Sequence, residues 1–201
     1  MKLKETLWVI GLIGLTTAIT SRVVSQDKPA SEYGQELPQW MKYAMPGEQH
    51  KQLEPFVGRW EQTVKLWMAP GAEPGQSYGS AEYKWIMGGR FLQGTYDGQM
   101  QGNRFEGMDV IGYDNFRNEY ISFWIDNHTT SFMFARGSYD PSAKTITMRG
   151  KHDDIMHGKR DKPFRTVTTF EGNDKLVYEM FTLGPDGKEY KVLQVTSTRR
   201  E

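Results

Sequence analysis

Asp126 and His128 are a pair of side chains in this sequence whose types and spacing suit proton transfer. They end a segment of alternating residues, and positions two apart in a β-strand share one face. A carboxylate beside an imidazole is the core of a general acid–base pair, although such a pair at a sheet end is often only a surface contact. We therefore treat Asp126 and His128 as candidate ligand contacts and assign no catalytic residue.

Glu179 is a carboxylate in the middle of an apolar segment, between Tyr178 and Met180. An unpaired charge inside a protein is costly, so an inward Glu179 needs a cationic partner. Arg165, on the preceding segment, and Arg199, near the end of the chain, are the candidates. Such a pair would either close the structure as a buried ion pair or hold the polar end of a ligand.

His152, Asp153, Asp154 and His157 form a cluster of metal-ligand residue types close together in the sequence. Imidazole and carboxylate groups bind zinc and other divalent ions, but a complete site needs a further ligand from elsewhere in the fold. Lysine and arginine residues surround the four, as in a solvated loop. We predict no metal site and no cofactor. The glycines of residues 88–112 are not followed by the helix that a nucleotide-binding loop requires.

The composition excludes several classes of function. The chain has 201 residues, no cysteine, and 25 basic and 25 acidic residues. Without cysteine there is no disulfide, no thiolate metal site and no thiol nucleophile. A charge near zero offers no electrostatic footprint for nucleic acid, which is bound through clustered lysine and arginine. The expected partner is a small apolar ligand.

Residues 1–25 have the pattern of a cleaved signal peptide. A short basic start precedes an apolar run of 13 residues, Leu7 to Ile19, whereas about 20 are needed to cross a bilayer. Small residues predict cleavage between Ser25 and Gln26. We expect an exported protein, periplasmic or secreted, with no membrane attachment after cleavage. Removing this segment takes away three basic residues and one acidic residue and leaves a net charge of −2.

The remaining chain is predicted to hold a polar leader, residues 26–45, and one domain, residues 46–201. Pro46 suits the first turn of a short helix that runs to about Leu53 and ends at Pro55. From Phe56 onward, β-rich segments alternate with turn residues every 8–12 positions, as in a β-sandwich or barrel. The predicted strands are 57–68, 78–87, 90–97, 104–113, 118–126, 130–138, 144–152, 163–171, 175–183 and 188–199.

Short connections favour sequential antiparallel pairing of these strands. The fold class is therefore all-β: a single antiparallel up-and-down barrel of about ten strands, with a short helix before the first. The last hairpin turns at Pro185-Asp186-Gly187, which suits a three-residue loop. That register would place Tyr178 opposite Gln194 and Glu179 opposite Leu193.

Alternation also predicts what fills the interior. The fifth strand carries aromatic residues on both faces, so one face lines either a mixed polar and aromatic cavity or an aromatic exterior. A barrel of this strand count is wide enough for a small ligand. We expect tryptophans and a few polar residues to line it: Trp60, Trp85, Trp124, Asp126, His128, Arg165 and Glu179.

The segment Gly58-Arg59-Trp60, preceded by a helix, resembles the start of the calycin barrels, which include the lipocalins and the fatty-acid-binding proteins. In those proteins an arginine from the last strand packs over the tryptophan. The resemblance implies that Trp60, together with Arg199 or Arg200, closes the base of the barrel and that the ligand site lies toward the other end.

From Pro46 to Arg199 the chain is also similar to the bacterial domain of unknown function family 1579. This resemblance implies a lipocalin-like barrel and no particular reaction. The segments that carry it are Met87-Gly88-Gly89-Arg90-Phe91-Leu92, Phe105-Glu106-Gly107, Gly112-Tyr113-Asp114-Asn115, Tyr120-Ile121-Ser122-Phe123-Trp124-Ile125-Asp126, Gly137-Ser138-Tyr139-Asp140, Glu179-Met180 and Thr198-Arg199.

Four functions fit these observations. The one we favour is an exported module that binds a small apolar ligand in a barrel cavity. The second is an isomerase or hydrolase that acts within the barrel, through Asp126 and His128 or through Glu179. The third is a haem carrier, which needs an inward histidine, and the fourth is a packed barrel that binds other proteins through an apolar patch near Trp40-Met41.

Overall fold

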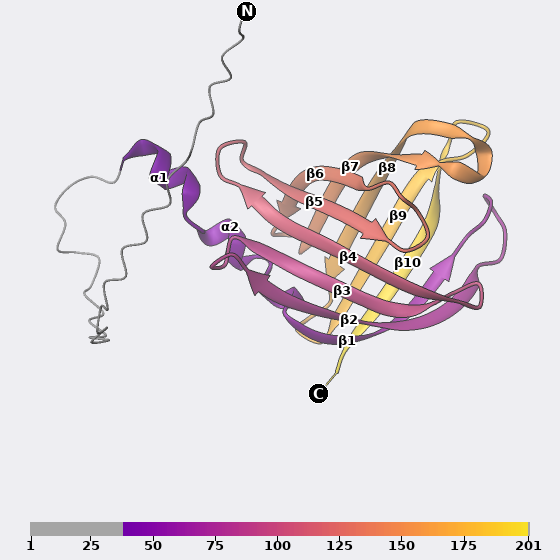
Figure 1. Cartoon of the computed structure of the whole chain (residues 1–201), viewed down its shortest axis with the longest axis horizontal. Helices are drawn as coiled ribbons and strands as arrows, with labels where there is room; N and C mark the ends of the chain where they lie inside the picture. The colour runs from indigo at the N-terminus through magenta and orange to yellow at the C-terminus, as the bar shows by residue number, and fades with distance from the viewer. Residues whose placement is uncertain (1–37, 201) are drawn as a thin grey trace, which may run out of the picture. The chain divides into compact units, whose positions relative to one another are not determined.

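The computed structural model describes residues 38–200, so the predicted signal peptide lies outside the described residues. These residues form three helical turns, then ten strands with one further 3₁₀ turn among them (Figure 1). None of the helices in this range is long and apolar enough to cross a membrane. The elements are α1 Gln39–Ala44, α2 Glu48–Lys51, η2 Glu54–Phe56, β1 Gly58–Leu66, β2 Gly75–Ile86, β3 Phe91–Met100, β4 Asn103–Asp114, β5 Glu119–Asp126, β6 Met133–Asp140, β7 Thr145–Asp154, η3 Ile155–His157, β8 Lys159–Phe170, β9 Lys175–Leu183 and β10 Glu189–Arg199.

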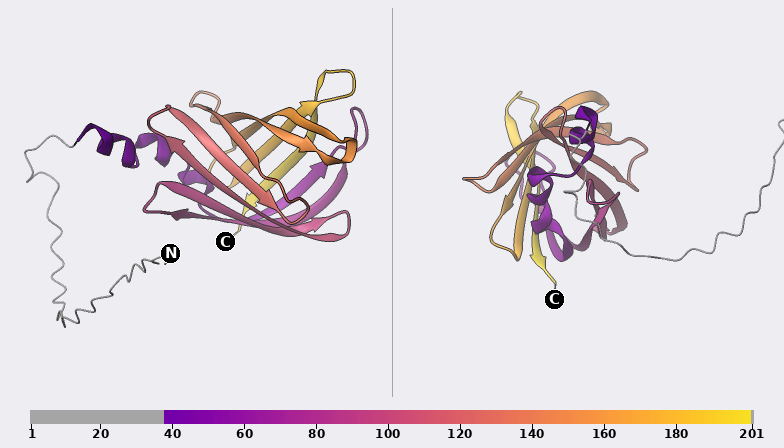
Figure 2. Two further views of the ribbon diagram at one scale, coloured as in Figure 1. Left: turned by 45° about the horizontal axis from the view of Figure 1, so that its top comes forward. Right: turned by 90° about the vertical axis from the view of Figure 1, so that its left-hand side faces the viewer.

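The strands form one closed barrel, which confirms the predicted fold class (Figure 2). Each strand pairs antiparallel with its neighbours in the chain, and β1 pairs with β10 to close the ring, from Trp60 opposite Arg199 to Leu66 opposite Leu193. Every predicted segment overlaps one observed strand. Closure leaves no free sheet edge, so all ten strands are paired on both sides.

A short helix precedes the first strand, as predicted, but the bounds of the helical part differ. Gln39–Ala44 is helical, although it falls within the predicted polar leader. The helix expected from Pro46 to about Leu53 is only Glu48–Lys51, and its start is fixed by His50, whose Nδ1 accepts the N–H of Gly47 at 3.0 Å. Contrary to the prediction, Pro55 does not follow the end of a helix. It lies in the first turn of η2, where a backbone N–H would have had no intrahelical partner, so proline is tolerated.

The β9–β10 hairpin has a different register from the one predicted. Tyr178 lies opposite Val195 and Glu179 opposite Gln194, because an extra residue, Val192, interrupts the ladder between Lys191 and Leu193. Such a bulge shifts the pairing by one position. Since opposed residues share a face, Tyr178 and Val195 point inward together, and Glu179 and Gln194 point outward.

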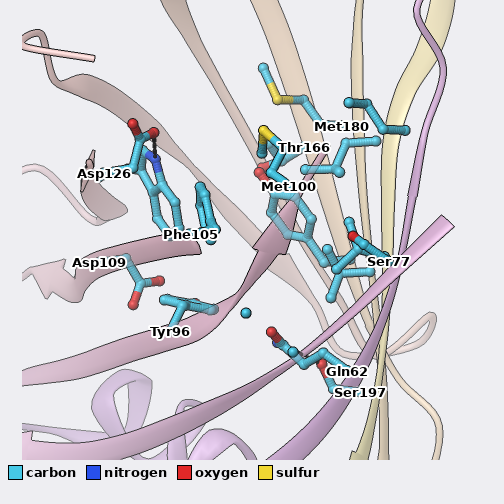
Figure 3. A pocket seen from close by; sticks show the side chains of 18 of the residues that line it. Gln62, Ser77, Tyr96, Met100, Phe105, Asp109, Asp126, Thr166, Met180 and Ser197 are labelled. Atoms are coloured by element: carbon cyan, nitrogen blue, oxygen red, sulfur yellow. Dashed lines mark hydrogen bonds between the residues drawn. The ribbon is translucent and has the colours of Figure 1, made fainter. Parts of the chain in front are cut away.

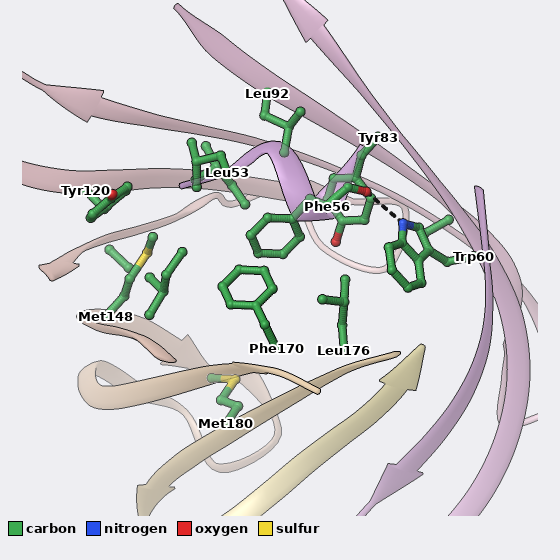
Figure 4. Close-up of a cluster of buried hydrophobic side chains, with 14 of the residues drawn as sticks. Leu53, Phe56, Trp60, Tyr83, Leu92, Tyr120, Met148, Phe170, Leu176 and Met180 are labelled. Carbon is green, nitrogen blue, oxygen red and sulfur yellow. Dashed lines mark hydrogen bonds between the residues drawn. The ribbon is translucent and has the colours of Figure 1, made fainter. Parts of the chain in front are cut away.

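One end of the barrel is closed by η2, whose Phe56 enters the interior (Figure 4). The Phe56 ring packs edge-on against Phe170, with centroids 5.0 Å apart, and lies 5.3 Å from Tyr83. Leu53 and Trp60 are fully buried beside it. Aromatic and aliphatic side chains therefore fill this closed end.

Trp60 and Arg199 join β1, β10 and η2 at the closed end. The Trp60 indole N–H donates to the carbonyl of Phe56 at 2.7 Å, and the Arg199 guanidinium lies 4.3 Å from the centre of the Trp60 ring. Arg199 also donates to the carbonyls of Val57 (2.7 Å), Pro55 (3.0 Å) and Asn173 (2.7 Å). Of the two arginines considered from the sequence, Arg199 makes this contact.

Arg200 is on the outside of the barrel. Its side chain is exposed, and its Nε is 3.9 Å from a carboxylate oxygen of the exposed Glu61. A surface pair of this kind adds little to stability.

Replacing Arg199 should therefore destabilise the barrel far more than replacing Arg200. Arg199→Ala removes charge-assisted hydrogen bonds and the stacking on Trp60, so we expect the free energy of unfolding to fall by roughly 2–4 kcal/mol. Arg200→Ala should change it by less than about 0.5 kcal/mol. Urea titrations followed by tryptophan fluorescence measure both values, and equal effects of the two variants would contradict this assignment.

Candidate functional site

The barrel contains a cavity of about 460 Å³ beyond the Phe56 plug. Side chains from all ten strands line it, and most of them are apolar or aromatic. Phe56 forms its floor, and residues such as Met68, Met100 and Gln101 stand at the opposite end, where β1 and β3 finish. The interior is therefore not filled by the protein's own side chains.

Glycines on two neighbouring strands make room for the larger side chains of this cavity. A Cβ atom at Gly94 would stand 2.2 Å from Oδ1 of Asp109 and 2.7 Å from the Tyr83 ring. A Cβ atom at Gly107 would stand 2.5 Å from the Trp124 ring. All three distances are too short for real contacts, so the present positions of Asp109 and Trp124 require glycine.

Asp109 is a buried carboxyl group in the cavity wall. It projects inward from β4, its side chain is almost completely buried, and Oδ1 has no hydrogen-bond partner (Figure 3). Burial raises the pKa of Asp109 to about 7, against the opposing effect of hydrogen bonding from Tyr96 and the backbone at Gly94. This carboxyl group can therefore exchange its proton near neutral pH.

Tyrosine hydroxyls, rather than basic groups, surround Asp109. The hydroxyls of Tyr83 and Tyr96 lie 2.5 Å apart, and Tyr178 reaches the same region from β9. Burial, followed by the nearby Asp109, raises the pKa of all three hydroxyls, so they stay neutral. Such a site can bind a hydrogen-bond donor or transfer a proton.

Trp124 and Asp126 both lie in the cavity wall. Oδ2 of Asp126 accepts the indole N–H of Trp124 at 2.9 Å, while Oδ1 accepts the backbone N–H groups of His128 (2.9 Å) and Thr129 (3.0 Å). Asp126 thus terminates β5 and orients the indole. The Trp124 ring lies between Tyr96, with centroids 5.0 Å apart, and Phe105, at 6.2 Å.

Two of the tryptophans expected in the lining belong to the closed end instead. Trp60 packs under Arg199, and the Trp85 indole N–H donates to Glu54 of η2 at 2.7 Å. Both face inward on their strands but lie at the level of the plug, so neither borders the cavity.

Arg165 and Glu179 project from the outer surface, so neither lines the cavity nor pairs with the other. On β8 and β9 the inward positions are their neighbours, such as Thr166 and Tyr178. Arg165 forms an ion pair with Glu189 at 2.6 Å, and Glu179 forms one with Lys191 at 2.9 Å. Both side chains are partly exposed on the outer face, so their charged ends stay in contact with water.

The histidines also lie outside the cavity lining. His128 is exposed, and its Nε2 is 3.4 Å from the carbonyl oxygen of Arg104. His157 contacts Asp154 at 3.0 Å, and that carboxylate is also bound by Lys162 at 3.0 Å. The Nε2 of His152 faces Thr182 at 3.4 Å, and burial lowers the pKa of this histidine.

Within residues 38–200, no three His, Asp or Glu side chains are placed together to hold a metal ion. Asp154 contributes instead to the turn around η3, where it also accepts the backbone N–H of His157 at 3.2 Å. The sequence cluster at 152–157 is thus divided: His152 packs against Phe164 and Thr182 of neighbouring strands, while Asp154 and His157 pair with each other at the end of β7.

Asp109, Tyr83 and Tyr96 are site residues that the sequence reasoning did not single out. The signal for Asp109 was present in strand 104–113: Phe105, Gly107, Asp109 and Ile111 alternate onto one face. Because Phe105 and Ile111 are apolar, that face is the buried one. Asp109 lies on the same face and is therefore expected inside the barrel.

Comparison with known proteins agrees with this architecture. A family model described as "Protein of unknown function (DUF1579)" matches residues 45–199. No curated protein sequence matches the chain.

Two solved structures resemble the chain at low sequence identity. The crystal structure of Rv2717c from M. tuberculosis is 13% identical, with a TM-score of 0.57, and the match covers 78% of this chain and all of that one. The S-type phycobiliprotein lyase CPES from Guillardia theta is 10% identical, with a TM-score of 0.53, over 82% of this chain and 99% of that one. At these identities the likeness concerns the fold.

Replacing Asp109 should change how stability depends on pH. The native pKa of about 7 is above the ordinary 3.8, so between these values the folded state binds more protons than the unfolded state. Stability from this group is therefore lost as the pH rises from about 4 to 7, by roughly 4 kcal/mol in total. Asp109→Asn lacks this loss. The free energy of unfolding of this variant should therefore rise relative to that of the wild type over the same pH range.

Urea titrations at several pH values between 4 and 8 measure this difference. Glu106→Gln is the matched control, because it neutralises an exposed carboxylate on the outer face of the same strand. Its difference from the wild type should stay within about 0.5 kcal/mol at every pH. A difference for Asp109→Asn that does not vary with pH would show that Asp109 is ionised normally in the folded protein.

Proposed function

The chain belongs to the DUF1579 family, whose function is not known, and we propose that its barrel binds one small, largely apolar molecule. The observation that carries this proposal is the cavity of about 460 Å³, closed at one end by Phe56. Protein interiors are normally packed as densely as organic crystals, and cavities of several hundred Å³ are typical of ligand sites. A hollow of this size, with few polar groups, suits an apolar ligand.

The shape of the cavity supports binding over the packed-barrel alternative. Small residues such as Ser122, Ala135 and Ser197 face the interior beyond the plug, where larger side chains would fill the space. Empty apolar volume costs stability, because its lining atoms lose contacts. A ligand that fills the cavity would restore those contacts.

The side chains in the wall favour binding over the catalytic and haem-carrier alternatives. The residues that line the cavity include no histidine, lysine or arginine. Both oxygens of Asp126 are used by Trp124 and by backbone N–H groups, and the exposed His128 ring lies near the carbonyl of Arg104 instead. Glu179 is outside the barrel. The sites considered for an enzyme, Asp126 with His128 and Glu179, are therefore not assembled in the lining, and no histidine is among the lining residues to bind a haem.

We also propose export, on the strength of the sequence of residues 1–25. The full-length chain, produced in a Gram-negative host, should be recovered from the periplasm with an intact mass that begins at Gln26. Recovery of the uncleaved chain from the cytoplasm would rule out export by this route.

A neutral apolar fluorophore, N-phenyl-1-naphthylamine, tests the proposed binding. Its fluorescence should rise on addition of the protein and saturate at one molecule per chain. Val64→Phe projects a ring into the cavity and should weaken binding at least tenfold, whereas Thr63→Phe, on the outer face of the same strand, should not. Equal binding by both variants would place the probe elsewhere and contradict the proposal.

A further inference from the structure

The carboxylates of the cavity have no cationic partner within it. Asp109 and Asp126 face the interior, and the lining contains no lysine, arginine or histidine. Asp97, at the rim, differs because it is paired with Arg104 at 3.1 Å outside the barrel. The interior is therefore a low-dielectric space whose fixed charges are negative only, and this repels anions and attracts cations.

Aromatic rings gather beside these carboxyl groups. Tyr96 and Trp124 meet edge to face at 5.0 Å, Phe105 stacks near Trp124 at 6.2 Å, and Asp109 lies next to Tyr96 (Figure 3). The faces of aromatic rings carry partial negative charge and attract cations, most strongly where water is excluded. A carboxyl group with aromatic neighbours is thus suited to a positively charged nitrogen.

The unpaired oxygen of Asp109 indicates the kind of nitrogen. Oδ1 is buried without a hydrogen-bond partner, and a buried acceptor that lacks one costs free energy. Asp109 lines the cavity, and rotation of its side chain away from Gly94 would bring this oxygen to a ligand N–H group that satisfies it. A quaternary nitrogen has no hydrogen to donate, and a fatty-acid carboxylate would bring a second negative charge into the same space.

We propose that the cavity, if it binds ligands as inferred above, selects an amphiphile with a protonated primary or secondary amine, which donates a hydrogen bond to Asp109 while its apolar part fills the barrel. Asp109 is the ion-pair partner in this complex. Asp126 holds the Trp124 ring in place and adds to the negative potential.

Binding of such an amine should depend on pH. The groups that face Asp109 are the neutral hydroxyls of Tyr83 on β2, Tyr96 on β3 and Tyr178 on β9, with Asp126 on β5 as the other cavity carboxylate. Because the pKa of Asp109 is about 7, this carboxyl group is mostly protonated below pH 7 and must lose its proton before it can pair with the amine. Amine affinity should therefore be about tenfold weaker at pH 6 than at pH 8.

Four ligands with the same ten-carbon chain test the proposal: decylamine, decyltrimethylammonium, 1-decanol and decanoate. Each is titrated against N-phenyl-1-naphthylamine bound to the full mature chain at pH 8. We expect decylamine to bind at least tenfold tighter than decanoate, with 1-decanol and decyltrimethylammonium between them. Equal or tighter binding of decanoate would overturn the proposal.

Variants and a pH series show whether Asp109 causes the preference for decylamine over decanoate. Asp109→Asn should reduce the preference for decylamine over decanoate to less than threefold, and Glu106→Gln, on the outer face of β4, should leave it unchanged. A preference that persists in Asp109→Asn would overturn the role of Asp109. Should that variant fail to fold, the pH series on the wild type decides, because affinity for decylamine that is constant from pH 6 to 8 also contradicts the proposal.

The outcomes separate this inference from the proposed function. Binding of N-phenyl-1-naphthylamine without displacement by any ten-carbon ligand, or with displacement by decanoate alone, leaves a ligand-binding barrel but refutes selection of amines. Failure of the fluorophore and of all four ligands to bind refutes both.

Discussion

The guanidinium of Arg199 lies on the ring of Trp60 and donates hydrogen bonds to the carbonyls of Pro55 and Val57, and this contact fixes the plug to the seam where β1 and β10 close the barrel. It joins the last strand to the first and ties both to the η2 turn, so that Phe56 is carried into the interior at one end. This end is filled by fully buried side chains such as Leu53 and Trp60, while other core residues, among them Ile146 and Met180, continue along the barrel as the wall of the cavity. The opposite end is thereby free to remain hollow, which is the condition for a ligand site.

The hollow end depends on a second constraint, the size of side chains on adjacent strands. Gly94 and Gly107 leave room for Asp109 and Trp124, and substitution of either glycine would force these groups to move. The polar part of the cavity is consequently built from a few large side chains that pack against glycines. A buried carboxyl group with an unpaired oxygen costs stability, and its presence in such a site is the usual sign of a binding or proton-transfer role.

Much of the fold, and little of the site, could be predicted from the sequence. Turn residues and alternation located all ten strands, and Gly58-Arg59-Trp60 with Arg199 indicated how the barrel closes. Arg165 and Glu179 were expected inside because charged residues in apolar segments look buried, but alternation on β8 and β9 turns them outward to their ion-pair partners.

The bulge at Val192 and the position of the cavity depend on packing between distant strands, which local patterns do not record. Asp109 could have been found from the alternation of strand 104–113, but its raised pKa could not, because this depends on burial by side chains from β2, β3 and β9. The level at which each tryptophan lies along the barrel axis is equally a property of the assembled barrel. Trp124 therefore reaches the cavity, while Trp60 and Trp85 belong to the plug.

Native mass spectrometry of the protein purified from its own organism shows directly whether the hollow end of the barrel holds a small molecule. We expect a complex of one chain with one small molecule, which dissociates on denaturation and is detected as a positive ion. Recovery of the bare chain alone, under gentle conditions that keep the fold intact, would contradict it.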